Sequence, residues 1–417
     1  MISIIKRNKG LALFLGCAMA VLSSCNKDLE QFAEAPAPEL SSLRALGDTL
    51  GSKARANDSL YFRLVVKSGL LPVINSKLNT YTLFVPDNNA MRVFINAISG
   101  GLVPLSAPDA VFSGFISANI PAPTAASIVG YNVVPQVINF SAITNVFPNF
   151  QYPTILNPAP QISAFLRLTT FPTNRHGNYV NNIPVISVNN FAANGVIHEV
   201  AAVVVPPSQF LWDRINADST PVTGLRYLKA AILRADSGTG TVGTLQSALL
   251  NIGANLTVFA PTDTAFKTIL TGAIFKALVA QGVPPAIALP TATALASSPT
   301  VFQNPALYGA LSARTVKGIL VYHILGSRAF TNNFPETATS YPTLLNGAVP
   351  THPGVSLTAT FIGISPFAIA ATVTGVFNPT ASNILINNAP APFGTSDQHY
   401  LNGVLHKIDQ VLIPAPL

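Results

Sequence analysis

Histidine and cysteine are the residue types in this chain best suited to acid–base, nucleophilic or metal chemistry, and there are six histidines and two cysteines. His198 and His406 stand in similar surroundings, NGVIHEV and NGVLHKI, and Tyr322-His323 lies in a mostly apolar run. The remaining histidines lie in stretches rich in Pro, Asn and Gly: His176, His352 and His399. None of these three has a Cys or another His beside it at the spacing of a metal site.

The patterns that usually mark a reaction centre are missing from the sequence. It contains no Gly-x-Ser-x-Gly elbow, phosphate-binding loop or dinucleotide fingerprint. His399 has one nearby acid, Asp397, which is too little for a metal site or a catalytic pair. The 16 acidic residues include no pair that stands out for glycoside hydrolysis. The sequence therefore predicts no catalytic residue, no metal site and no cofactor.

Each of the two matched histidines is expected to take a structural role. In a strand, alternate residues share one face, so His198 lies with Val196 and Val200 on the face that points into the core. His406 lies in the same way with Val404 and Ile408. Three charged residues fall on the opposite face and are expected outside: Glu199, Lys407 and Asp409. A histidine in an apolar run is usually a buried, hydrogen-bonded residue, and this also favours a structural role for His323.

The element that must position these residues occurs twice. Leu256–Leu270, LTVFAPTDTAFKTIL, repeats the pattern of Tyr81–Ile95, YTLFVPDNNAMRVFI. An offset of 175 pairs Phe259 with Phe84 and Pro261 with Pro86. Each copy predicts a short strand, a turn led by proline, and a helix whose apolar residues share one face. The residue after the proline, Thr262 or Asp87, can cap the first free amides of that helix.

A second motif supports the duplication. Asn194-Gly195 returns as Asn402-Gly403, each followed by Val-x-His and a β-branched run. Asn-Gly favours a hairpin or a bulged turn, because both residues tolerate positive φ. The early and late motifs together resemble the two conserved motifs of the fasciclin adhesion domain. The resemblance implies an α+β fold of two tandem fasciclin-like domains, 39–207 and 208–417, each a β-sheet wedge with flanking helices.

The same resemblance suggests a binding segment. Tyr322 and His323 occupy the position of the family's Tyr-His pair, which in animal members has been associated with receptor binding. The first copy has Tyr131-Asn132 at that place, so its histidine is missing.

The N-terminus reads as a targeting segment. Three basic residues precede the apolar run Leu11–Leu22, which is too short to span a bilayer, and the run ends in Leu22-Ser23-Ser24-Cys25. This ending resembles the lipobox of bacterial lipoproteins and implies that residues 1–24 are a signal peptide and that Cys25 is lipidated. The alternative is a plain signal peptide with a chance cysteine. Residues 25–38 then form a polar tether, whose Lys27-Asp28 pair either directs the protein to the outer face of the outer membrane or belongs to a solvated spacer.

Composition excludes other classes of protein. Charged residues make up 9% of the chain, but beyond the N-terminus Pro, Asn, Thr and Gly interrupt every apolar run before it reaches the length of a spanning helix. Removing residues 1–24 takes three basic residues from 23 and leaves 20 against 16 acidic ones, a net charge of +4. The basic residues form no stripe, so nucleic-acid binding is rejected.

Other elements follow from periodicity and spacing. Helices are predicted near 43–50, 60–68, 110–116 and 307–319, and strands with long loops between 140 and 188. From motif Phe to motif His there are 114 residues in the first copy (84 to 198) and 147 in the second (259 to 406). We expect the excess to lie in loops at Gly282–Pro305 and Asn387–Tyr400.

Three functions are compatible with these features. The first is a non-enzymatic adhesion or binding lipoprotein of the outer membrane, which meets a protein or polysaccharide ligand at the cell surface. The second is an accessory lipoprotein that captures glycan for a polysaccharide importer, with loop aromatics stacking on sugars: Tyr179, Tyr341 and Tyr400. A hydrolase is the least favoured.

Overall fold

The computed structural model describes residues 43–144, 146–238, 243–363, 367–390 and 393–416. Leu43–Leu417 forms one compact unit. The signal peptide, Cys25 and the tether lie outside the described residues, so these predictions are not tested. Within the described part, no helix combines the length and apolar character needed to cross a bilayer.

The helices of the first copy lie before and after its first strand. They are α2 (Leu46–Leu50), α3 (Ser59–Ser68), α4 (Leu71–Ile74), α5 (Asn88–Ile98), α6 (Asp109–Asn119) and α7 (Ala122–Tyr131), with a 3₁₀ turn at Lys53–Asp58. Helix α3 ends where Gly69 takes φ 74°, a left-handed conformation that suits glycine at a helix C-terminus. The helices predicted near 60–68 and 110–116 are therefore confirmed, and α7 was not predicted.

The sheet of the first copy joins the two conserved motifs. Strand β1 (Tyr81–Pro86) runs parallel to β8 (Gly195–Val200), and Phe84 lies opposite His198. The full order is β2-β1-β8-β7-β6-β5. The other strands are β2 (Val133–Val134), β5 (Pro172–Thr173), β6 (Tyr179–Val180) and β7 (Ile183–Ala192), beside a separate pair β3 (Tyr152–Pro153) and β4 (Thr169–Thr170). The predicted pairing of 183–188 with the run from Val196 is confirmed.

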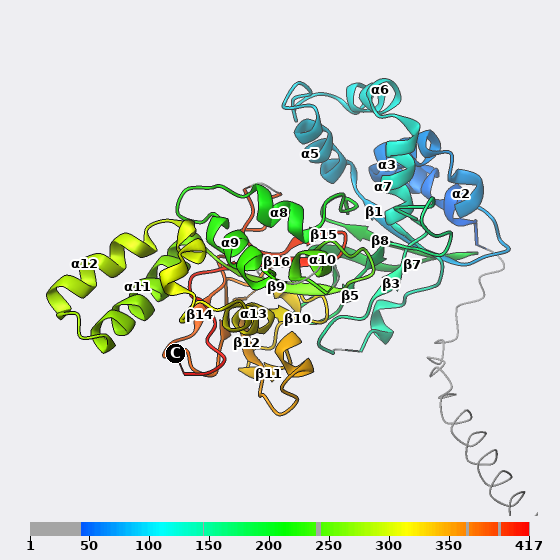
Figure 1. The fold of residues 1–417 in the computed structure, drawn as a ribbon. Helices are drawn as coiled ribbons and strands as arrows, with labels where there is room; N and C mark the ends of the chain where they lie inside the picture. The colour runs from blue at the N-terminus through cyan, green and yellow to red at the C-terminus, as the bar shows by residue number, and fades with distance from the viewer. Residues whose placement is uncertain (1–42, 145, 239–242, 364–366, 391–392, 417) are drawn as a thin grey trace, which may run out of the picture. The chain divides into compact units, whose positions relative to one another are not determined.

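The second copy repeats this plan (Figure 1). Its helices are α8 (Leu211–Ala217), α9 (Arg226–Ala235), α10 (Leu245–Leu249), α11 (Asp263–Ala280), α12 (Pro285–Ala296) and α13 (Ala313–Tyr322). Strand β9 (Leu256–Pro261) runs parallel to β16 (Gly403–Ile408), with Phe259 opposite His406, in a sheet ordered β10-β9-β16-β15. The outer strands are β10 (Ile324–Leu325) and β15 (Gln398–Tyr400).

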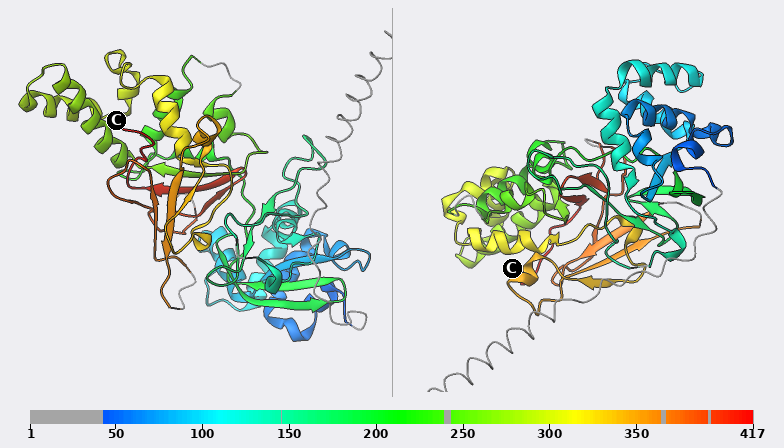
Figure 2. Two further views of the ribbon diagram at one scale, coloured as in Figure 1. Left: turned by 90° about the horizontal axis from the view of Figure 1, so that it is seen from below. Right: turned by 90° about the vertical axis from the view of Figure 1, so that its right-hand side faces the viewer.

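A second sheet completes this copy. Its order is β11-β12-β13-β14, formed by β11 (Thr339–Tyr341), β12 (Val355–Thr360), β13 (Ala370–Thr374) and β14 (Ser382–Asn383). One face of β9 and β16 packs on the helices, through Val258 and Leu405. The other face packs on the second sheet, through Phe259 and Ile408. Figure 2 shows helices on one side of β16 and the strands of the second sheet on the other.

This layering corrects one expectation. Lys407 was placed on a solvent face, but all six residues of β16 are buried because both faces of the strand are covered. The side chain of Lys407 is 1% exposed and lies 2.6 Å from the carboxylate of Asp218. Glu199 and Asp409 are half-buried rather than outside.

The inserted sequence is also different from the expectation. Residues 285–296 form helix α12, with Pro290 inside it, rather than a loop. Figure 1 shows α12 beside α11, and the hydroxyl of Tyr227 donates to the carbonyl of Ala296 at its end. Alanines at helical spacing fill the contact: Ala288, Ala292 and Ala296 are buried. Helix α13 begins at Ala313 and continues through Tyr322, so the Tyr-His segment is a helix end.

Candidate functional site

The matched histidines lie in the same hydrogen-bond environment. In the first copy Nδ1 of His198 accepts from the amide of Asn189 at 3.0 Å, and Nε2 lies 2.8 Å from the carbonyl of Ile138. In the second, Nδ1 of His406 accepts from the amide of Asp397 at 3.2 Å, and Nε2 lies 2.9 Å from the carbonyl of Ala329. Both rings are fully buried. Each ring is therefore a neutral imidazole with both nitrogens engaged.

The donors to these rings share an uncommon backbone. Asn189 and Asp397 each precede their histidine by nine residues, and both take positive φ, 60° and 53°. Their side chains then accept from a second segment, the amide of Phe140 at 3.1 Å and the amide of Thr331 at 2.7 Å. Asn and Asp are the residues that tolerate this conformation best. Only an Asn or Asp nine positions before each histidine could have pointed to the arrangement.

Asn132 and His323 also fill one structural position. The side-chain nitrogen Nδ2 of Asn132 donates to the carbonyls of Ile128 and Val204, both at 2.8 Å. Nδ1 of His323 lies 2.8 Å from the carbonyl of Ile319, and Nε2 accepts from the amide of Leu412 at 2.8 Å. In each copy the side chain joins the carbonyl four residues earlier in its helix to the segment after the last strand.

The tyrosines that precede them are buried too. The hydroxyl of Tyr131 donates to the carbonyl of Thr169 at 3.0 Å, and that of Tyr322 donates to the carbonyl of Gly354 at 2.6 Å. Tyr322 is 0% exposed and His323 1%. A ligand could therefore reach this suggested binding segment only if α13 moved, and the segment stays a prediction.

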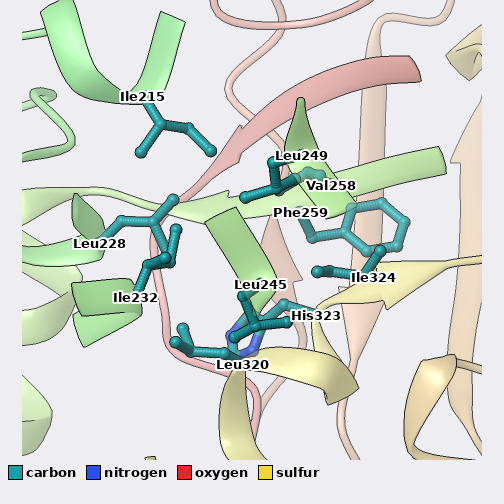
Figure 3. A pocket seen from close by; sticks show the side chains of 10 residues that line it. All are labelled: Ile215, Leu228, Ile232, Leu245, Leu249, Val258, Phe259, Leu320, His323 and Ile324. Atoms are coloured by element: carbon teal, nitrogen blue, oxygen red, sulfur yellow. The ribbon is translucent and has the colours of Figure 1, made fainter. Parts of the chain in front are cut away.

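A small cavity borders His323 (Figure 3). Its volume is about 10 Å³, close to the space of one water molecule. Its lining is otherwise apolar: Ile215, Leu228, Ile232, Leu245, Leu249, Val258, Phe259, Leu320 and Ile324. Because both nitrogens of His323 already have partners, a water molecule there would find no hydrogen bond. The cavity is a packing defect rather than a ligand site.

The Asn-Gly motifs hold the start of each copy to its sheet. Oδ1 of Asn194 accepts from the amide of Leu46, and Oδ1 of Asn402 accepts from that of Leu211. Each residue thus serves the N-terminus of the first helix of its copy. Gly195 has φ 151°, and a Cβ there would lie 1.9 Å from the carbonyl oxygen of Tyr81. The glycines therefore let β8 lie close to β1, and β16 close to β9.

The first motif is equally structural. Phe84 and Phe259 are fully buried. Pro86 and Pro261 end their strands. As predicted, the side chains of Asp87 and Thr262 accept hydrogen bonds from the backbone amides of Ala90 and Ala265. These bonds cap the N-termini of helices α5 and α11.

The other histidines also have partners. Nε2 of His399 accepts from the guanidinium of Arg328 at 2.6 Å. Nε2 of His352 lies 3.0 Å from the carbonyl of Pro414, and Nδ1 of His176 lies 2.9 Å from Glu336. Among the described residues, no group of three or more His, Cys, Asp or Glu could hold a metal ion.

Burial lowers the pKa of four histidines and so favours their neutral form. It lowers the pKa of His198 to about 4 and that of His323 to about 4. The pKa of His406 is also lowered by burial, although the carboxylate of Asp397 opposes the shift. Burial and the adjacent Arg328 hold the pKa of His399 well below 6.5. A ring that is neutral, buried and bonded at both nitrogens can neither shuttle protons nor bind metal.

A buried charge cluster lies on the helix side of β16. The carboxylate of Asp218 pairs with Nζ of Lys407 at 2.6 Å and with the guanidinium of Arg214 at 3.0 Å. Burial disfavours the charged form of Asp218, but the bonds from Lys407 and Thr220 outweigh it and lower its pKa. At the matching place in the first copy, Glu199 pairs with Arg55 at 2.6 Å, so the sign of the charge is reversed. Sequence reasoning missed this cluster because Lys407 lies far along the chain from Arg214 and Asp218.

Comparisons with known proteins give a family match and a similar solved structure. Residues 57–206 match the fasciclin domain family. The chain carries a fasciclin domain. A solved structure of a fasciclin-type domain pair, from the insect cell adhesion molecule Fasciclin I, is similar with 14% identity, 86% of this chain and 98% of that chain covered, and a TM-score of 0.29. Among curated proteins no match was found.

The second copy repeats the central elements of the fasciclin domain at 57–206. Its parallel strand pair, its capped helix, its Asn-Gly motif and its buried histidine repeat those of the first copy. The chain is therefore an α+β protein of two tandem fasciclin-type copies, as the two motifs predict. The boundary at 207/208 remains a prediction, since Leu43–Leu417 is one compact unit.

Proposed function

We propose that this protein is a non-enzymatic binding protein of the cell surface, held to the outer membrane by lipid on Cys25 and mediating adhesion through its fasciclin-type copies. Fasciclin domains are associated with adhesion and binding, and the family match at residues 57–206 carries the proposal. The membrane attachment rests on the sequence Leu22-Ser23-Ser24-Cys25.

The chemistry of the histidines supports a binding role. Three of them are buried with lowered pKa, and their ring nitrogens hold backbone segments together: His198, His323 and His406. These residues stabilise the fold instead of meeting a substrate. In an adhesion protein such a core supplies a rigid support for surface loops.

The residues named for glycan capture do not favour that alternative. Tyr179 and Tyr400 are 2% and 3% exposed, because they lie in strands β6 and β15 instead of open loops. Tyr341 is half-buried and packs on the core between the sheets. No tyrosine of this set presents an open ring for stacking on a sugar.

Binding by coated beads tests the proposal. Beads carrying residues 26–417 should attach to cells or to surface material from cells, saturably and in competition with free protein. Beads carrying heat-unfolded protein are the control. Attachment equal to that control would contradict the adhesion role, and saturable binding to a single polysaccharide would favour glycan capture instead.

A further inference from the structure

A loop of the first copy displays apolar side chains without packing them. Phe165 is 92% exposed and Ile162 is 70% exposed. Both lie between β3 and β4, in the loop 157–167, which we call the Phe165 loop. Isolated exposed apolar residues are ordinary, but two large ones at the tip of one loop leave apolar surface in water at a cost.

Side-chain and backbone hydrogen bonds hold this loop in shape. Asn157 accepts from the amide of Ala159 at 2.9 Å and donates to the carbonyl of Ser163 at 2.8 Å. The hydroxyl of Ser163 accepts from the amide of Phe165 at 3.2 Å. The loop is thus ordered by its own polar groups, while its large apolar side chains point away from the core.

The base of the loop is tied to the fold. The amide of Leu168 donates to the carbonyl of Leu156 at 3.0 Å, and the hydroxyl of Thr154 donates to the carbonyl of Leu168 at 2.8 Å. Ala159 and Leu168 are buried at 5% exposure. A fixed base of this kind limits the entropy that the tip would lose on binding.

The loop carries a positive charge and no negative one. Arg167 is exposed, and its guanidinium donates to the carbonyls of Ala164 and Leu166 at 2.8 and 2.7 Å. The sequence has no Asp or Glu between Asp109 and Glu199. An apolar tip with a cation at its base and no acidic residue in the loop complements a lipid bilayer, which is apolar inside and negative at its surface.

We propose that the Phe165 loop is a membrane-contact element, which inserts Phe165 and Ile162 into the boundary of an anionic lipid bilayer while Arg167 faces the headgroups. This inference extends the proposed membrane attachment by adding a contact that needs no acylation. It would set which side of the first copy faces the bilayer and leave the rest open to partners.

Vesicle sedimentation of the unacylated chain tests the inference separately from the lipid anchor. Residues 26–417 contain the whole compact unit Leu43–Leu417 and lack both signal peptide and acyl chains. We expect them to sediment with vesicles of phosphatidylcholine and phosphatidylglycerol. Phe165→Ser should reduce the bound fraction about tenfold or more, as expected for one large apolar side chain kept out of lipid. Arg167→Gln should weaken binding to these anionic vesicles and should not change binding to vesicles of phosphatidylcholine alone.

A matched control comes from the second copy, where Phe393 is 79% exposed. Phe393→Ser should leave the sedimented fraction unchanged, and all variants should keep the wild-type Tm because the substituted side chains are exposed. Binding that is absent, or equal in wild type and Phe165→Ser, would overturn the inference. So would a loss in Phe165→Ser of binding to a neutral polysaccharide without any vesicle binding. Labelling of Cys25 with fatty acid could succeed or fail without changing either result.

Discussion

Asn132 and His323 join the same two segments in the two copies. Each side chain contacts the carbonyl four residues earlier in its helix, and each also reaches the segment that follows the last strand of its copy. The missing histidine of the first copy is therefore replaced by a side chain that links the same two segments, with Asn132 donating to the carbonyl of Val204 where His323 accepts from the amide of Leu412. This pairing makes a structural role of the Tyr-His segment directly testable.

Substitution of His323 should follow the first copy. His323→Ala leaves the carbonyl of Ile319 and the amide of Leu412 buried without this partner and opens a cavity, so we expect a loss of about 2 to 4 kcal/mol. His323→Asn, which copies Asn132, should lose less than about 1.5 kcal/mol. Urea unfolding measures both values.

The same variants test the binding segment. If the Tyr-His segment contacts a partner directly, His323→Asn should abolish binding by coated beads while stability changes little. We expect bead binding to stay within experimental scatter. Equal destabilisation by Asn and Ala would instead contradict the proposed equivalence.

Acid should destabilise the fold. The folded-state pKa of His198 and of His323 is about 4, below the unfolded value of 6.5, so the unfolded chain binds more protons as the pH falls through that window. Stability is full above about pH 6.5 and declines below it, by about 3 kcal/mol for each of these two residues at pH 4. The lowered pKa values of His399 and His406 add to the effect.

Urea midpoints between pH 7.5 and 4.5 measure this dependence. His323→Asn removes one of the titrating rings, so its stability should fall less steeply with pH than that of wild type. A stability that is flat or that rises on acidification would mean that these rings are charged in the folded state.

The Asn-Gly glycines should not accept a side chain. In Gly403→Ala the new Cβ would meet the carbonyl oxygen of Leu256 at 2.5 Å, and we expect a loss of about 2 to 3 kcal/mol. Gly272, in the exposed middle of α11, is the matched control, with open space around a Cβ. Gly272→Ala should raise stability by about 0.5 to 1 kcal/mol, because alanine is the better helix former. Thermal unfolding that ranks the two variants in the opposite order would exclude close approach as the reason for the motif.

The buried charge cluster predicts an asymmetry between its members. Asp218→Ala removes a buried carboxylate that pairs with two buried cations, Lys407 and Arg214, and should cost about 3 to 5 kcal/mol. Lys407→Met leaves Asp218 paired with Arg214 and replaces a buried ammonium by an apolar chain, so stability should stay within about 1 kcal/mol of wild type. Chemical denaturation distinguishes the two, and similar losses would show that Lys407 stabilises the cluster by more than charge balance.

The repeated motifs predicted much of the fold, because their signals are local. The strand, proline and cap at Tyr81–Ile95 recur at Leu256–Leu270, and the structure confirms both. Periodicity could not place Lys407, because alternation assumes one covered face and β16 is covered on both. Helix α12 was missed because Pro290 and the many prolines nearby are typical of loops, whereas its alanines pack on α11. Tertiary contacts decided both cases.

Part of the candidate site could likewise be predicted from the sequence, and part could not. The burial of His198 and His406 follows from the apolar residues on either side of them. Their partners could not be predicted, since Ile138 and Ala329 lie 60 and 77 residues away in the chain. The exposure of Phe165 was likewise hidden, because only the folded loop shows which aromatic residues reach solvent.

Adhesion by intact cells tests the central claim most directly. Cells that produce the wild-type chain, cells that lack it, and cells that produce Cys25→Ala should be compared for aggregation and for attachment to cell-surface material. The account predicts attachment by the first strain only, with Cys25→Ala folded but released into soluble fractions without incorporated fatty acid. Equal attachment by all three strains would contradict the account.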